Sequence, residues 1–264
     1  MHKSINRNRM GKIIAVTNQK GGVGKTTTAV NLSASLAYKG KSVLLIDSDP
    51  QGNSTSGTGI EKEKIKYSLY DCLADPDLIK DAVIKTRQKN LSVIPSKNDL
   101  SAAEIELASE DEREFILKTA LSPIKNQFDY IFIDSPPALG MLTINILTAS
   151  DSVLIPIQCE YYALEGLTQL ISSIQTIKKS LNKQLDIEGI LATMYDKRTN
   201  LSVQVFEEIK NHFPDKVYNT VIPRNVRLSE APSYGQPILK YDITSSGAEA
   251  YFSLARELLK NNNK

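Results

Sequence analysis

The chain has 264 residues, of which 41% are hydrophobic and 23% charged, and 32 basic residues against 30 acidic ones give a net charge of +2. This composition is ordinary for a soluble globular protein, and a chain of this length can bury a substantial core. Because the net charge is small, any nucleic-acid binding must use a local basic patch. The two cysteines, Cys72 and Cys159, lack metal-ligand spacing, which argues against zinc or iron–sulfur sites and favours packed thiols in a reducing cytosol.

The ends of the chain show no targeting or membrane signal. No segment approaches the ~18 apolar residues of a membrane span, and Met1–Arg9 is basic and polar, unlike a secretory signal. We therefore expect a cytoplasmic protein. Residues 1–10 are predicted to be a disordered basic extension, residues 11–260 a single domain, and residues 261–264 a frayed tail.

Apolar runs alternate with segments of helical periodicity along the chain. The apolar runs predict strands at Ile13–Thr17, Ser42–Asp47, Leu91–Pro95, Tyr130–Asp134, Ser152–Pro156, Ile187–Met194 and Thr220–Pro223. Helical spacing predicts helices at Thr26–Tyr38, Ser101–Ser109, Glu112–Gln127, Leu164–Leu181, Val203–His212 and Ser246–Lys260, with polar loops at Gly52–Lys66 and Tyr195–Asn200. Strands that are apolar throughout are covered on both faces, so this pattern predicts a doubly wound, mostly parallel α/β sheet with helices on both sides.

A glycine-rich segment stands between the first predicted strand and the first predicted helix. It reads Gln19-Lys20-Gly21-Gly22-Val23-Gly24-Lys25-Thr26-Thr27, which is the context that a phosphate-binding loop requires. The glycines let backbone N–H groups turn toward phosphate oxygens, and the helix that follows adds the positive end of its dipole. Lys25 is predicted to reach the β- and γ-phosphates, and the Thr26 hydroxyl to bind Mg²⁺.

This loop departs from the standard pattern at its first position. The standard pattern begins with a glycine where this chain has Gln19, and an additional lysine, Lys20, precedes the two adjacent glycines. A ligand-free turn before a helix is the alternative interpretation, but a turn needs neither three glycines nor a Lys-Thr pair at the start of the helix.

Carboxylates stand at the ends of two predicted strands. Asp47 and Asp49 follow the second strand and Asp134 ends the central one, and the carboxyl ends of parallel strands meet at the rim where α/β sheets bind ligands. Asp134 is predicted to hold Mg²⁺, and Asp49 is predicted to position the attacking water. For Asp47 the alternative to a role in the site is a structural one. Helix capping or turn formation is the competing interpretation for all three.

The motifs together resemble the ParA/MinD group of deviant Walker A ATPases. The resemblance rests on K-G-G-V-G-K-T-T at Lys20–Thr27, D-S-D-P-Q-G-N at Asp47–Asn53 and I-D-S-P-P at Ile133–Pro137. Q-C-E-Y-Y-A-L-E-G at Gln158–Gly166 and I-P-R-N-V-R-L-S-E-A-P at Ile222–Pro232 are similar to the Soj branch of chromosomal ParA proteins. The likeness runs from about Gly11 to Leu259.

The resemblance implies a mechanism in which ATP with Mg²⁺ drives homodimerisation. Lys20 then reaches across the interface to the partner's phosphates, so that hydrolysis depends on assembly. The ATP-binding set that it implies places Gly21 at the tightly packed nucleotide sandwich and Pro223 and Asn225 near the adenine. The full set is Lys20, Gly21, Gly22, Val23, Gly24, Lys25, Thr26, Thr27, Pro223 and Asn225, of which Lys20 and Lys25 join Asp49 as catalytic residues.

The resemblance also implies partners. The ATP-bound dimers of this group bind DNA without sequence specificity, and a ParB-type protein stimulates hydrolysis, so we expect slow, partner-stimulated turnover on the nucleoid. Arg198, Arg224 and Arg227 are the expected DNA contacts. Solvated charges or ion pairs with Asp196 and Glu230 are the alternative for these arginines.

Two other functions compete with this interpretation. A MinD-like membrane-cycling ATPase carries a basic amphipathic tail, whereas here the apolar face of Ser246–Lys260 is expected to pack on the sheet, leaving four polar residues. We therefore expect no membrane partner. An electron donor of the nitrogenase-reductase type requires paired cysteine ligands, and neither Cys72 nor Cys159 has that setting.

Overall fold

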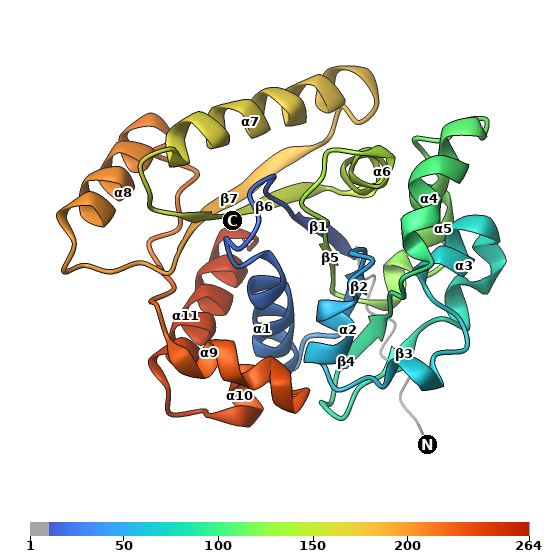
Figure 1. The fold of residues 1–264 in the computed structure, drawn as a ribbon, viewed down its shortest axis with the longest axis horizontal. Helices are drawn as coiled ribbons and strands as arrows, with labels where there is room; N and C mark the ends of the chain where they lie inside the picture. The colour runs from blue at the N-terminus through green and yellow to red at the C-terminus, as the bar shows by residue number, and fades with distance from the viewer. Residues whose placement is uncertain (1–10, 264) are drawn as a thin grey trace.

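The computed structural model describes residues 11–263, so the predicted extension at residues 1–10 and the last residue of the predicted tail lie outside the described residues. One seven-stranded sheet forms the centre of the molecule, in the order β3-β4-β2-β5-β1-β6-β7, and only the β3–β4 pair is antiparallel (Figure 1). The strands are β1 (Lys12–Val16), β2 (Val43–Asp47), β3 (Ile84–Lys85), β4 (Leu91–Ile94), β5 (Tyr130–Asp134), β6 (Ser152–Gln158) and β7 (Asp186–Thr193). The predicted doubly wound α/β fold is confirmed.

Helices cover both faces of this sheet, because alternate strand residues point to opposite sides. Ile13 and Ala15 of β1 pack with one layer of helices, and Ile14 and Val16 with the other. The first layer contains α3 (Leu69–Ala74), α4 (Leu100–Glu106), α5 (Ile116–Leu121), α6 (Met141–Ala149), α7 (Ala163–Ser180) and α8 (Asn200–His212) (Figure 1). The second contains α1 (Lys25–Tyr38), α9 (Val226–Glu230), α10 (Ile238–Tyr241) and α11 (Ser246–Asn261).

Several predicted elements were wrong. The segment Thr220–Pro223 is not a strand: it pairs only through an isolated parallel bridge between Tyr195 and Pro223, at which the Ile222 amide donates to the Ala192 carbonyl at 2.8 Å. The predicted helix at Glu112–Gln127 is limited to α5 and a 3-10 turn at Lys125–Gln127, since Pro123 interrupts it and Glu112 has a positive φ of 50°.

Other elements were missed. The predicted loop at Gly52–Lys66 contains α2 (Asn53–Gly57) and a 3-10 turn at Lys62–Lys64. Helix α6 was missed because its apolar residues are spread around the helix and show no amphipathic period. Further 3-10 turns lie at Pro76–Lys80, Leu107–Ser109 and Ala231–Tyr234.

Helix α11 closes the chain against α1. Its apolar face is buried in the second core layer, as predicted. The buried residues are Ala248, Tyr251, Leu254, Ala255 and Leu258. The helix runs to Asn261, and the Asn262 side chain donates to Glu188 at 2.8 Å. Within residues 11–263, none of the helices has both the length and the apolarity that crossing a bilayer demands.

Candidate nucleotide site

The glycine-rich loop joins β1 to α1 at the carboxyl edge of the sheet. Gly22 (φ 75°) and Gly24 (φ 85°) adopt the left-handed conformation, which glycine tolerates at least cost. The loop is anchored from β6 and β7: Asn18 Nδ2 donates to the Pro156 carbonyl at 2.8 Å, and the Thr193 hydroxyl donates to the Val23 carbonyl at 2.7 Å. The backbone that would cradle phosphates is therefore held in place by neighbouring strands.

The two loop lysines occupy different environments. Lys25 is buried, and its Nζ donates to the Lys20 carbonyl at 3.2 Å. Burial lowers the pKa of Lys25, while the nearby carboxylates of Asp134 and Asp49 oppose that shift. Lys20 instead points outward, with 54% of its side chain exposed, and forms an ion pair of 2.5 Å with Glu160. The structure thus brings Lys25 to the carboxylates and leaves Lys20 at the surface.

Asp134 lies at the end of β5 beside the start of α1. It is fully buried, accepts a hydrogen bond from the Ser54 hydroxyl at 2.7 Å on Oδ2, and interacts with the Thr26 hydroxyl. Its Oδ1 atom has no hydrogen-bond partner among the described residues. Burial raises the pKa of this carboxyl, with the charge of Asp47 as the second cause. An unpartnered buried carboxylate oxygen beside a threonine hydroxyl fits a hard cation such as Mg²⁺.

Asp47 and Asp49 have separate surroundings, although both follow β2. Asp47 is opposite Asp134 in the β2–β5 register, and its Oδ2 accepts hydrogen bonds from the amide (2.6 Å) and hydroxyl (2.7 Å) of Thr55. Its Oδ1 accepts the amide of Asp49 at 3.2 Å, so Asp47 holds both the turn and α2. Asp49 is half-buried and accepts the Gln51 amide at 2.9 Å. The hydrogen bonds of Asp47 therefore give it a structural role. Asp49 lies beyond the end of β2, and its carboxylate interacts with Lys25.

A cavity of about 320 Å³ opens beside the glycine-rich loop. Pro223 and Asn225, the residues predicted near the adenine, line it together with Gly22, Gly24 and Thr27. Asn225 Oδ1 accepts the amide of Arg227 at 2.8 Å and so caps α9, while its Nδ2 donates to Ser246 at 2.8 Å. Because its side chain is engaged in this way, Asn225 contributes to the cavity mainly by fixing the loop around it.

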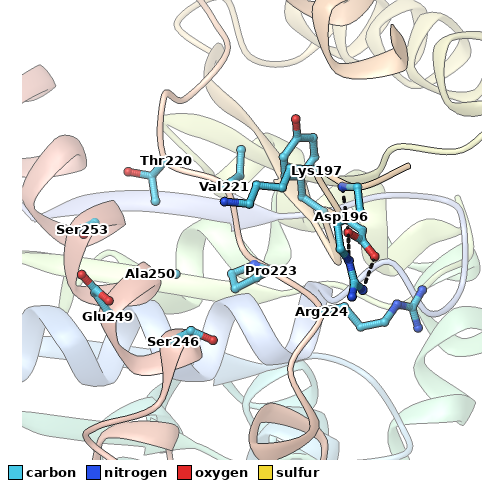
Figure 2. Close-up of a pocket in the computed structure, with 12 residues that line it drawn as sticks. Asp196, Lys197, Thr220, Val221, Pro223, Arg224, Ser246, Glu249, Ala250 and Ser253 are labelled. Atoms are coloured by element: carbon cyan, nitrogen blue, oxygen red, sulfur yellow. Dashed lines mark hydrogen bonds and ion pairs between the residues drawn. The ribbon is translucent and has the colours of Figure 1, made fainter. Parts of the chain in front are cut away.

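A second cavity, of about 530 Å³, adjoins the first and shares Pro223 and Arg224 with it (Figure 2). Arg198 also lines this cavity, where it forms a bidentate pair with Asp196 at 2.7 and 2.9 Å and remains 84% exposed. Arg224 is exposed and has no ion-pair partner within the described part of the chain. The structure thus brings two of the three predicted DNA-binding arginines together.

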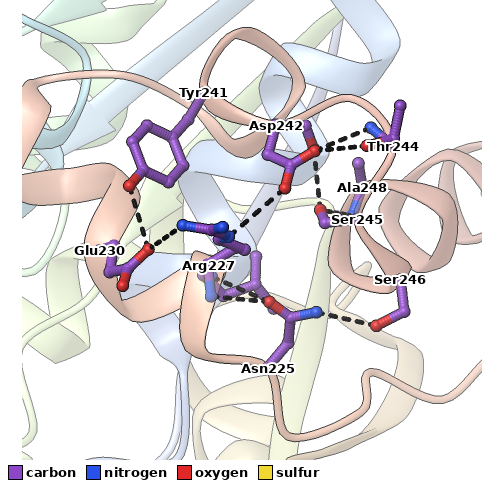
Figure 3. A network of polar contacts seen from close by, with 10 residues as sticks. Asn225, Arg227, Glu230, Tyr241, Asp242, Thr244, Ser245, Ser246 and Ala248 are labelled. Carbon is purple, nitrogen blue, oxygen red and sulfur yellow. Dashed lines mark hydrogen bonds and ion pairs between the residues drawn. The ribbon is translucent and has the colours of Figure 1, made fainter.

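Arg227 belongs to a separate polar network around the start of α9 (Figure 3). It pairs with Glu230 at 2.9 Å and Asp242 at 3.5 Å, and the Tyr241 hydroxyl donates to the same Glu230 carboxylate at 3.0 Å. The hydrogen bond to Glu230 is the main cause that raises the pKa of Arg227. The ion pairs that were the alternative interpretation are present for Arg198 and Arg227, whereas Arg224 is the unpaired cation.

Sequence reasoning missed several residues of the site. Glu160 lies inside the Gln158–Gly166 motif, but only the structure shows that it pairs with Lys20. Ser54 and Thr55 fall in a segment predicted as a loop, and their hydroxyls bond the two buried aspartates. Thr193 ends β7, where nothing in the local pattern distinguishes an anchoring threonine from an ordinary strand residue.

The chain matches the family described as an AAA domain over residues 11–187. The sporulation initiation inhibitor protein Soj of Bacillus subtilis (strain 168) is 61% identical over 252 residues, covering 96% of this chain and 100% of Soj. The chromosome partitioning protein ParA of Myxococcus xanthus (strain DK1622) is 53% identical over 251 residues, covering 95% of this chain and 89% of that one.

Among solved structures, cobyrinic acid a,c-diamide synthase from Mycobacterium smegmatis with bound ADP and magnesium superposes with a TM-score of 0.84 at 35% identity, covering 97% of this chain and 96% of the other. A glycine-rich loop with an offset lysine, a buried strand-end aspartate beside it, and this degree of identity over nearly the whole length agree with one another. The chain therefore belongs to the Soj/ParA family of chromosome-partitioning proteins, within the ParA/MinD superfamily.

Proposed function

We propose that this protein is an ATPase that dimerises on binding ATP, binds DNA without sequence specificity and drives chromosome or plasmid partitioning. The observation that carries the proposal is the buried Asp134, whose carboxylate interacts with Lys25 and Thr26 and whose Oδ1 has no hydrogen-bond partner among the described residues. The Myxococcus xanthus relative, which is named as a chromosome partitioning protein, supports the biological role.

ATP is the substrate and Mg²⁺ its cofactor. The amides of Gly21, Gly22, Val23 and Gly24 and those at the start of α1, with Thr26 and Thr27, receive the phosphates, and the adenine occupies the cavity lined by Pro223 and Asn225. Thr26 and Asp134 hold the metal ion, which neutralises charge on the β- and γ-phosphates. The homologous synthase structure with bound ADP and magnesium supports this ligand pair.

Hydrolysis is assigned to Asp49 and the two lysines. Asp49 positions the attacking water: its Oδ1 accepts the Gln51 amide, and within the described residues no hydrogen bond occupies its other oxygen. Lys25 stabilises charge on the phosphates, and its burial away from water strengthens that attraction. Of Asp49, Lys20 and Lys25, only Asp49 can act on the attacking water, which agrees with slow turnover that a ParB-type partner stimulates.

Dimerisation completes the site through Lys20. Its exposed side chain, which among residues 11–263 pairs only with the half-exposed Glu160, is free to turn toward a second subunit's phosphates. A Cβ at Gly21 would meet nothing within 4 Å inside one ligand-free subunit, so packing within the subunit does not require glycine there, which is consistent with a role at bound nucleotide between subunits. This arrangement makes assembly and turnover interdependent.

DNA binding is assigned to Arg198, Arg224 and Arg227, in a protein that works on the nucleoid in the cytoplasm. The arginines of one subunit are few, and pairing two such patches in a dimer multiplies a modest affinity. Phosphate contacts of this kind give binding that weakens steeply with salt.

The function is tested by measuring ATP hydrolysis with and without Mg²⁺, DNA and the N-terminal segment of a ParB-type partner. We expect slow Mg²⁺-dependent turnover that DNA and the partner segment stimulate together. Asp49→Ala should retain ATP binding and dimerisation but lose turnover. Normal hydrolysis by Asp49→Ala would reject its assignment, and absence of both ATP and DNA binding by the wild-type protein would reject the function.

A further inference from the structure

A groove of about 350 Å³ with both apolar and acidic lining lies between α3 and α4, away from the nucleotide site. Leu73, Ala103, Leu107 and Ile116 contribute apolar surface to it, while Pro76 and Ala74 form part of its edge. The helices α3, α4 and α5 stand together at the β3–β4 end of the sheet (Figure 1). A volume near the lower end of the usual range for ligand pockets suits one or two apolar side chains rather than a folded domain.

The rim of this groove is strongly acidic. Glu106, Glu110 and Asp111 line it, and residues 99–114 hold seven acidic residues and one basic residue in a chain whose net charge is only +2. The single basic residue, Arg113, is already paired with Glu114 and donates to the Ala108 carbonyl. Within the described residues, no ion pair neutralises the carboxylates of Glu110 and Asp111.

The groove is also connected mechanically to the nucleotide site. Glu104, next to Ala103 on α4, accepts the amides of Met141 (2.6 Å) and Leu142 (3.2 Å) at the start of α6. Gly140 admits this carboxylate, because a Cβ there would stand 2.3 Å from Glu104 Oε2. Residues 135–140, between Asp134 and α6, are therefore tied to α4 by a charged helix cap.

We propose that this groove docks a basic, amphipathic peptide segment of a partner protein, and that Glu104 transmits its occupancy to residues 135–140. Apolar side chains beside the carboxylates of Glu110 and Asp111, which no cation neutralises within the described residues, match a helix with leucine-like side chains on one face and lysine or arginine beside them; the third rim carboxylate, Glu106, accepts the Tyr70 hydroxyl. The same charge repels anionic lipid and nucleic acid. The effect on ATP turnover rests on the function proposed above; the docking itself does not.

Docking is tested by fluorescence anisotropy on the nucleotide-free, full-length protein. The probe is a short labelled helical peptide with leucines on one face flanked by lysines, and its control replaces each lysine with glutamate. We expect saturable binding of the lysine peptide alone, weakened about tenfold by the double change Glu110→Gln and Asp111→Asn, since each exposed ion pair contributes modestly. Ala74→Arg, at an exposed edge position, should abolish binding.

The matched control removes two exposed carboxylates from α8, by Glu207→Gln and Glu208→Gln, and should leave the affinity unchanged. Absence of binding to the wild-type protein, or equal affinity for the rim variant and this control, would overturn the proposal. A tenfold gain in affinity on deletion of residues 1–9 would also overturn it, because the chain's own basic segment would then be the occupant.

Transmission is tested by hydrogen exchange at the amides of Met141 and Leu142. Peptide binding should change their exchange rates in the wild-type protein, whereas Glu104→Ala should bind the peptide and show no such response. An identical response in both proteins would exclude Glu104 as the link. The exchange measurement contains no nucleotide, so it can be interpreted even for a variant that has lost ATPase activity. If peptide binding changes the exchange at Met141 and Leu142 but the protein hydrolyses no ATP, the proposed function is rejected and the docking proposal is not.

Discussion

The ion pair between Lys20 and Glu160 leads to a prediction about assembly. If Lys20 must leave Glu160 to reach a second subunit, then Glu160 competes with the dimer for the same ammonium group. Glu160→Gln removes the competing charge and keeps the shape of the side chain. The pair is half-exposed, with 54% of the lysine and 45% of the glutamate side chain accessible, so its contribution is small.

The expected size of the effect follows from this exposure. Exposed ion pairs contribute about 0.2–1 kcal/mol, and a symmetric dimer breaks two of them, which gives about 0.4–2 kcal/mol. Dimerisation in ATP should therefore become about 2- to 30-fold tighter in Glu160→Gln. High salt should reduce the difference, because screening already weakens the pair in the wild-type protein.

Sedimentation velocity with ATP measures this constant, in an Asp49→Ala background that prevents turnover. Glu165→Gln, an exposed carboxylate in the first turn of α7, is the matched control and should leave dimerisation unchanged. In a Lys20→Ala background, Glu160→Gln should have no further effect. Weaker dimerisation of Glu160→Gln would refute the reasoning, because Glu160 would then make a contact across the interface rather than compete with it.

Three further predictions concern the aspartates and Arg224. Burial, and next the charge of Asp47, raise the pKa of Asp134 to about 7, and protons compete with Mg²⁺ for the ionised form. The Mg²⁺ concentration for half-maximal turnover should therefore rise as pH falls through that value and stay low above it; a flat profile would exclude Asp134 as a ligand. Asp47→Asn loses acceptor capacity toward Thr55 and Asp49, so urea unfolding should show a loss of about 1–3 kcal/mol, and unchanged stability would contradict its structural role. Arg224→Ala should weaken DNA binding and lower the salt slope by about one per subunit, with Lys210→Ala on α8 as control; an unchanged slope would move the DNA surface elsewhere.

The sequence patterns placed the glycine-rich loop and the aspartates correctly between or at the ends of the elements that the structure shows, because both signals are local. Continuous apolar runs marked β1, β2 and β5, and the rule that parallel strands present their carboxyl ends at one edge predicted that Asp134 would lie on the same rim as the loop that holds Lys25. The structure brings Pro223 and Asn225 to the cavity beside Gly22 and Gly24, as the family resemblance implied. Their roles in binding remain predictions.

What escaped prediction depends on contacts between distant segments. The Lys20–Glu160 pair spans 140 residues, and the link from Glu104 to Met141 joins two helices of which one was missed. The arginines divide in the same way: the pairs of Arg198 with Asp196 and of Arg227 with Glu230 are local in sequence and were the alternative interpretation, whereas the second pair of Arg227, with Asp242, was not anticipated. Such pairings follow from packing, which a local pattern does not encode.

The central claim is that Lys20 acts in the partner subunit's site, and subunit complementation tests it most directly. Lys20→Ala and Asp49→Ala are each expected to hydrolyse little ATP alone. In a mixed dimer, the intact Lys20 of the second subunit serves the intact Asp49 of the first, so one of two sites becomes complete. With random pairing, an equimolar mixture should regain about a quarter of the wild-type rate. If Lys20 acted within its own subunit, neither site of the mixed dimer would be complete, and the absence of any regained activity would contradict the account.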